Sequence, residues 1–148
     1  VLFRSRELFF GPYYEQSLTV KKGGRELLAA LKNAHIPVAL ATSTAQASVL
    51  KELKDAGIRD YFDQVVCGDM VSHSKPHPEI FLTACAALGA KPEKTIVIED
   101  SYNGIRAAHA GGMMPVMVPD MLQPTEEIEK MTIAVCESLL VVKENIGL

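Results

Sequence analysis

The chain has 148 residues, of which 48% are hydrophobic and 22% are charged, and its mean hydropathy is slightly positive at +0.13. This length and composition suit one globular domain with a substantial apolar core. The net charge of −3 and the lack of a Lys/Arg cluster argue against nucleic acid as a partner.

The sequence also indicates where the protein resides. No apolar run approaches the ~18 to 20 residues of a membrane span, and the amino-terminal stretch carries arginines where a signal peptide would be apolar. Cys67, Cys85 and Cys136 are widely spaced, odd in number and outside any C-x-x-C pattern. We therefore expect a reduced, cytoplasmic protein without a membrane partner.

Apolar β-rich runs alternate with amphipathic helical segments along most of the chain. The predicted elements are a helix over 24–33, a strand over 36–41, a helix opened by 42–44 and ended by Gly57, a strand over 65–67, a helix within 75–89, a strand over 95–100, a helix over 103–112, a strand over 114–120, a short strand over 133–136 and a helix from 138. The second helix is expected to bury Val49, Leu50 and Leu53. This alternation predicts a doubly wound α/β domain, a parallel sheet with helices on both faces.

Ligands of such sheets bind beyond the carboxyl ends of the strands, so the residues that follow each strand are candidates for a site. Thr42, Ser43 and Thr44 follow the first strand, beside a helix amino terminus that favours an anion. Plain capping of that helix explains these hydroxyls equally well. Lys75 follows the second strand and its loop, where a lone lysine is more often simply solvated.

Glu99 and Asp100 end the third strand. Asp100 or Ser101 could cap the next helix. The adjacent carboxylates of Glu99 and Asp100, however, repel each other unless a cation or a buried base offsets their charge. We expect a metal, because hard divalent cations prefer carboxylate oxygens. Hydroxyls, a lysine and a metal are parts that phosphoryl transfer needs, and only a nucleophile is missing.

Three stretches carry a family resemblance. VALATST, then GDMVSHSKPHPEIFLTACAALG, then IVIEDSYNGIRAAHAGGM resemble the second, third and fourth motifs of the haloacid dehalogenase superfamily, in its β-phosphoglucomutase-like phosphatase branch. The similarity runs from about Val20 to Asp120. It implies a Mg²⁺-dependent phosphatase or phosphomutase that acts on a small phosphomonoester such as a sugar phosphate.

The resemblance also implies roles for individual residues. Thr42 and Lys75 would be catalytic, and together with Ser43 they would bind the phosphoryl group. Glu99 and Asp100 would hold Mg²⁺. The first motif of the family, an Asp-x-Asp that supplies the nucleophile and the acid/base, is absent from the 148 residues.

This absence shapes the expected domain organisation. Residues 1–20 are interpreted as a remnant of a helical cap and its linker, residues 21–148 as the α/β core, and the stretch VLFRS as foreign sequence. We expect the central first strand of the sheet to be missing, which would make the chain an inactive fragment and leave a gap that offers a surface for self-association.

Two alternatives to an enzyme follow from the same residues. A non-catalytic module could keep the phosphate and metal contacts without turnover. A phosphoacceptor receiver domain has a similar set of residues, but its acidic pair would precede the Thr and Lys, whereas here the acids come last. His35, His73, His77 and His109 share no ligand spacing, which favours solvated or capping roles over zinc.

Overall fold

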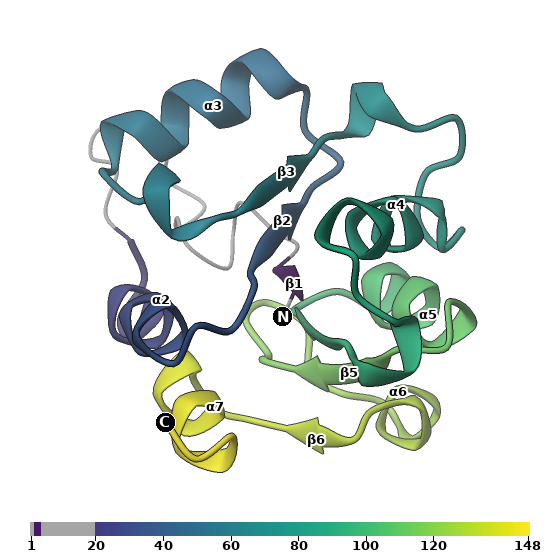
Figure 1. The fold of residues 1–148 in the computed structure, drawn as a ribbon. Coiled ribbons are helices and arrows are strands. Elements are labelled where there is room, and N and C mark those ends of the chain that lie inside the picture. Colours follow the sequence, from purple (N-terminus) through teal and green to yellow (C-terminus); the bar gives the residue numbers. More distant parts are fainter. Residues whose placement is uncertain (1, 4–19) are drawn as a thin grey trace.

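The computed structural model describes residues 2–3 and 20–148 (Figure 1). Among these residues, six strands form one parallel sheet in the order β3-β2-β1-β4-β5-β6. The strands are β1 (Leu2–Phe3), β2 (Ala39–Ala41), β3 (Gln64–Val66), β4 (Ile96–Glu99), β5 (Met114–Met117) and β6 (Ala134–Val135). The predicted doubly wound α/β class is therefore confirmed.

Six α-helices and three short 3₁₀ helices connect these strands in the described part of the chain. They are α2 (Gly24–Asn33), α3 (Gln46–Asp55), η1 (Arg59–Tyr61), η2 (Gly68–Met70), α4 (Glu79–Leu88), η3 (Pro92–Lys94), α5 (Tyr102–Ala110), α6 (Glu126–Met131) and α7 (Leu139–Asn145). In Figure 1, α2 and α7 lie side by side on one face of the sheet, and α4 lies next to α5 on the other face.

The strands divide their side chains between two cores, as a buried parallel sheet requires. Leu40, Ile98 and Val116 belong to one core, which also contains the apolar faces of α2, α3 and α7. Ala39, Ala41 and Val97 belong to the other, which α4 and α5 complete. Helices α4 and α5 therefore cover the face onto which the side chain of Glu99, two positions after Val97, also projects.

The predicted helices agree closely with the observed ones. Helix α2 begins and ends where the spacing of its leucines predicts, and Leu27, Leu28 and Leu31 are fully buried. Helix α4 follows Pro78 and ends at Gly89, whose positive φ of 64° favours glycine. The pattern did not predict α6, although its N-cap Thr125 accepts a hydrogen bond from the Ile128 amide as a capping residue does.

Two local predictions need correction. The strand expected over 36–41 starts only at Ala39, since Pro37 has no N–H and the amide of Val38 donates to the Asp63 carboxylate at 2.8 Å. Leu50 was expected on the buried face of α3 but is 37% exposed, because Val49 and Leu53, four residues apart, already define that face.

The prediction that the central strand is missing is wrong. Leu2 and Phe3 form β1, which pairs in parallel with Ala39–Leu40 of β2 and with Val97–Ile98 of β4. The facing edges of β2 and β4 would otherwise leave backbone donors and acceptors unpaired, and β1 satisfies part of them. The cap and linker expected before residue 20 otherwise fall on residues outside the described ones, and self-association through a gap stays a prediction.

Helices long and apolar enough to cross a bilayer do not occur among residues 2–3 and 20–148.

Candidate active site

The candidate site residues lie beyond the carboxyl ends of β2 and β4, on both sides of β1. Thr42 directly follows β2, and Glu99 is the last residue of β4, followed by Asp100. Lys75 lies on the segment between η2 and α4. In a doubly wound sheet of this strand order, the crevice between the two halves opens at these strand ends.

The structure brings Lys75 and Glu99 together. The Lys75 ammonium donates from Nζ to Glu99 Oε1 at 3.3 Å and to the carbonyl oxygen of Ala41 at 3.3 Å. The side chains of the pair are 3% and 0% exposed. Because a buried charge is tolerated only when it is paired and hydrogen-bonded, each of these residues depends on the other.

An aromatic ring completes the surroundings of the lysine. Phe81 belongs to the first turn of α4, and Lys75 Nζ lies 4.3 Å from the centroid of its ring. A desolvated ammonium over an aromatic face gains roughly 2 kcal/mol. The prediction of a merely solvated lysine therefore does not describe Lys75, which is a fixed point charge at the sheet edge.

The Glu99 carboxylate occupies a cradle at the start of α5. Its Oε2 accepts hydrogen bonds from the backbone amides of Asp100 and Ser101, both at 2.8 Å. A Cβ added at Gly104 would lie 1.8 Å from Glu99 Oε1, so only glycine leaves room for the carboxylate. The cap of α5 is Ser101, whose Oγ accepts from the Gly104 amide at 3.1 Å.

The hydroxyls after β2 do not cap α3. The N-cap of α3 is Ala45, which makes no side-chain cap, and the Gln46 amide donates instead to both oxygens of Asp69 at 3.2 Å. Thr42 is buried, and its Oγ1 accepts from the Thr44 amide at 3.2 Å. Asp69 therefore binds the first amide of α3, and capping of α3 does not explain the hydroxyls that follow β2.

Close backbone packing fixes the segment after β2. A Cβ on Gly68 would lie 2.2 Å from the carbonyl oxygen of Ser43, and the Gly68 amide donates to Thr44 at 3.1 Å. The Ser43 side chain itself is exposed at the strand-end edge. The turns after β2 and β3 thus hold each other in place.

Burial and the nearby Asp69 carboxylate raise the pKa of the Cys67 thiol to about 11. At pH 8 only about one thiol in a thousand would be ionised, and the thiolate is the reactive form. In a variant with Cys85→Ala and Cys136→Ala, we expect Cys67 to react with an aromatic disulfide reagent only as fast as the protein opens. Labelling of the native protein as rapid as in denaturant would contradict this assignment.

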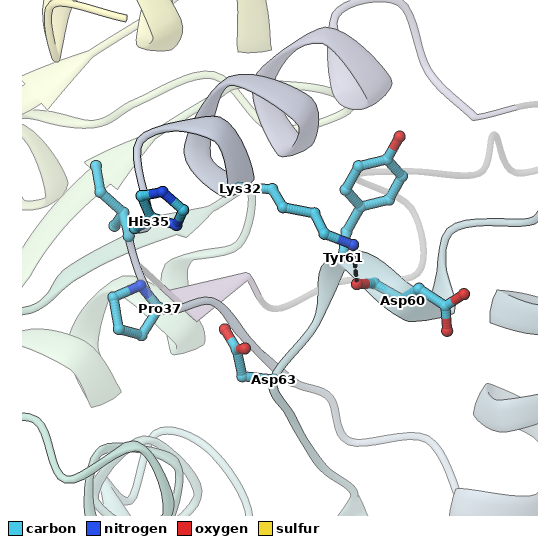
Figure 2. A pocket seen from close by; sticks show the side chains of 7 residues that line it. Lys32, His35, Pro37, Asp60, Tyr61 and Asp63 are labelled. Atoms are coloured by element: carbon cyan, nitrogen blue, oxygen red, sulfur yellow. Dashed lines mark hydrogen bonds between the residues drawn. The ribbon is translucent and has the colours of Figure 1, made fainter.

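A hollow lies at the amino ends of β2 and β3 and is separate from Lys75 and Glu99. Figure 2 shows its lining, in which Lys32 Nζ donates to the carbonyl oxygen of Asp60 at 3.0 Å. The lining residues are Lys32, His35, Ile36, Pro37, Asp60, Tyr61 and Asp63. These residues precede β2 and β3, so they lie at the amino ends of the strands, where doubly wound sheets do not bind their ligands.

Several contributors to the site were not predicted from the sequence. In the sequence, Gly104 is an ordinary helical glycine and Phe81 an ordinary core aromatic residue. Only their distances to Glu99 and Lys75 show that they contact the site. The roles assigned to Thr42 and Ser43 stay predictions.

The chain is similar to known hydrolases in sequence and in structure. A family model described as haloacid dehalogenase-like hydrolase matches residues 11–118. The phosphorylated carbohydrates phosphatase of Thermotoga maritima is 41% identical over 100 residues, which are 68% of this chain and 46% of that protein. The chain thus spans about half the length of this curated relative.

Solved structures show the same similarity in three dimensions. A β-phosphoglucomutase from Clostridium difficile superimposes with a TM-score of 0.75 at 31% identity, over 86% of this chain and 55% of that one. CbbY from Rhodobacter sphaeroides in complex with phosphate gives a TM-score of 0.73 at 34% identity, over 82% of this chain and 55% of that one.

Proposed function

The chain belongs to the haloacid dehalogenase-like hydrolase family, and from this premise we propose that it forms the phosphate-binding and metal-binding part of a phosphatase or phosphomutase. The observation that carries the proposal is the buried Lys75–Glu99 pair at the strand-end edge, next to Thr42 and Asp100. A relative named for phosphorylated carbohydrates makes a small sugar phosphate the substrate class we propose.

Lys75 and the turn after β2 would hold the phosphoryl group. The Lys75 ammonium is compact, buried and held between β2 and β4, so it can neutralise phosphoryl oxygens without reorganising. Thr42 would supply its hydroxyl and Ser43 its backbone amide from the turn beside α3, whereas the Thr42 amide already donates to the Val66 carbonyl oxygen at 2.9 Å. Phosphoryl transfer depends mostly on such positioning and charge neutralisation.

Glu99 and Asp100 fit a hard divalent cation. Both are carboxylates, Asp100 lies half-buried directly after β4, and the glycine cradle at Gly104 fixes the neighbouring carboxylate against the start of α5. We propose that Asp100 holds Mg²⁺ and that Glu99 supports it while it orients Lys75. Mg²⁺, when bound, would neutralise the charge that develops on the phosphoryl oxygens.

The attacking and proton-donating groups are not among the chain's own residues. An aspartate pair of the form Asp-x-Asp does not occur in the sequence, and neither Asp69 nor Asp120 offers such a pairing. Asp69 already accepts from the Gln46 amide, and Asp120 pairs with Lys21. We therefore propose that the 148-residue chain by itself does not turn over a phosphomonoester.

A non-catalytic phosphate-binding module is the second candidate. The buried Lys75–Glu99 pair would serve binding as well as catalysis, and the relatives named as phosphatases favour the catalytic candidate. The two candidates differ in what an added Asp-x-Asp strand and cap would do: a catalytic core would turn over a sugar phosphate, whereas a binding module would only retain it.

The lysine offers a test once that segment is present. In residues 21–148 fused behind the nucleophile strand and cap of the Thermotoga maritima relative, Lys75→Ala should lower kcat/KM for a sugar phosphate by ~10² to 10³, as loss of such an electrostatic group does. Lys75→Arg should also be poor, because a planar fork cannot replace a compact point charge. Near-normal kcat/KM in both folded variants, measured by phosphate release, would contradict the assigned role.

A further inference from the structure

The segment that presents Lys75 carries two histidines and a glutamate that meet on the surface. His73 Nδ1 lies 2.7 Å from Glu79 Oε2, and the rings of His73 and His77 stack with their centroids 4.5 Å apart. One ligand atom from each of the three residues lies within 4.8 Å of the others. His73 and His77 lie two positions before and after Lys75 on a segment without helix or strand, where sequence spacing does not determine which side chains meet.

We propose that His73, His77 and Glu79 form a binding site for a first-row transition metal ion such as Zn²⁺, separate from the carboxylates Glu99 and Asp100. Two imidazoles and one carboxylate are a ligand set that suits Zn²⁺ and its neighbours and not Mg²⁺ or Ca²⁺, which prefer oxygen alone. A fourth position would remain for water.

The His73–Glu79 side of the site needs only a small movement, and the His77 ligand atom, within 4.8 Å of the other two, needs to approach them by at most about 1.4 Å. Ligand atoms at about 2.1 Å from a tetrahedral ion lie about 3.4 Å apart, so His73 Nδ1 and Glu79 Oε2 need to separate by less than about 1 Å. The side chain of His73 is 64% exposed, and that of Glu79 is 28% exposed. The metal would take the place of the hydrogen bond between His73 Nδ1 and Glu79 Oε2.

The backbone already orients the carboxylate. Glu79 Oε1 accepts from the Ser72 amide and Oε2 from the His73 amide, both at 2.9 Å. These bonds and the His73 ring hold the pKa of Glu79 below its ordinary value. A carboxylate has about four acceptor positions, so coordination remains open to it while it accepts these amides. A hollow lined by Ser72, His73, Ser74, Pro76, His77 and Pro78 gives access from solvent.

Binding would act on the segment that carries Lys75. Residues 73 and 77–79 would be joined through the ion, while Lys75 between them stays anchored on Glu99 and Ala41. The ion would therefore brace the Lys75 segment from its solvent side, whatever chemistry takes place on the buried side.

Titration of the metal-free chain with ZnCl₂ by calorimetry tests the proposal. We expect one equivalent to bind with 5 mM Mg²⁺ present, and His73→Ala or His77→Ala to weaken binding by ~10-fold or more, as loss of a ligand should cost at least what loss of a supporting residue does. His109→Ala is the matched control, since His109 is exposed at the end of α5, and it should leave the affinity unchanged. Asp100→Asn should also leave it unchanged.

Co²⁺ spectroscopy of the same proteins adds a readout of ligand type. We expect bands of nitrogen and oxygen ligation without thiolate charge transfer, since the three cysteines are buried. Zinc affinity that survives in the double variant His73→Ala/His77→Ala, or is lost in Asp100→Asn, would overturn the proposal, as would absence of binding by the unaltered chain. The histidines are exposed, but His77 Nδ1 accepts from the Glu79 amide at 3.2 Å, so we expect each replacement to lower the free energy of unfolding without zinc by at most about 1–2 kcal/mol, and the variants stay folded. These outcomes do not depend on the proposed phosphatase function.

Discussion

Lys75→Met and Glu99→Gln, each made alone, should lower the free energy of unfolding by about 3–5 kcal/mol, because each removes one charge of a buried ion pair. The pair is 3% and 0% exposed, so water cannot take over the role of the missing partner. Urea unfolding followed by circular dichroism measures both values.

The double variant Lys75→Met/Glu99→Gln should be more stable than the sum of the single losses predicts. Replacement of both charges removes the uncompensated group, so the coupling in a double-mutant cycle should amount to about 1–3 kcal/mol. The exposed pair Lys51 and Asp55 on α3 is the control, and its cycle should give at most about 0.5 kcal/mol. Equal coupling in both cycles would contradict the assignment of Lys75 as a buried, paired charge.

Gly104→Ala should destabilise the protein by about 3 kcal/mol or more, although alanine in a helix is ordinarily better than glycine by about 1 kcal/mol. The added Cβ would lie 1.8 Å from Glu99 Oε1 and would expel the carboxylate from its cradle. This displacement would also break the contact of Glu99 with Lys75. The sign of the change therefore separates the steric explanation from helix propensity.

Gly111→Ala provides the matched control at the other end of α5. Its φ of −81° is open to alanine, and an added Cβ would lie 3.2 Å from the flexible end of Met113 and 3.3 Å from Pro78 Cβ, both much farther than the 1.8 Å at Gly104. We expect a change within about 1 kcal/mol. A Gly104→Ala protein as stable as the Gly111→Ala protein, measured by the same urea unfolding, would contradict the cradle.

Helix positions were predictable from the sequence, for a physical reason. Leu27, Leu28 and Leu31 recur at helical spacing, and Gly57 and Gly89 end helices where a positive φ is needed. Strand lengths were less predictable, because a short apolar run does not determine which of its amides form hydrogen bonds with a neighbouring strand. The amide of Val38 bonds to Asp63 instead, which no local pattern shows.

The candidate site was predictable only in part. The topology brings the ends of parallel strands to one edge, so the meeting of Lys75 with Glu99 follows from the order of the elements. Steric fit does not follow from the order of the elements, so the sequence pattern does not single out Gly104. The contact of His73 with Glu79 depends on how one irregular segment folds back on itself, which spacing rules for helices and strands do not cover.

Phosphate release from a sugar phosphate, measured with Mg²⁺ and with EDTA, tests most directly the claim that this chain is the phosphate-binding and metal-binding core of a phosphotransfer enzyme. Residues 21–148 fused behind the nucleophile strand and cap of the Thermotoga maritima relative should release phosphate only with Mg²⁺, and Asp100→Asn should abolish the release. The unextended chain should release none. A folded fusion that binds the sugar phosphate without turnover, or an active unextended chain that loses its activity in Asp100→Asn, would contradict the account.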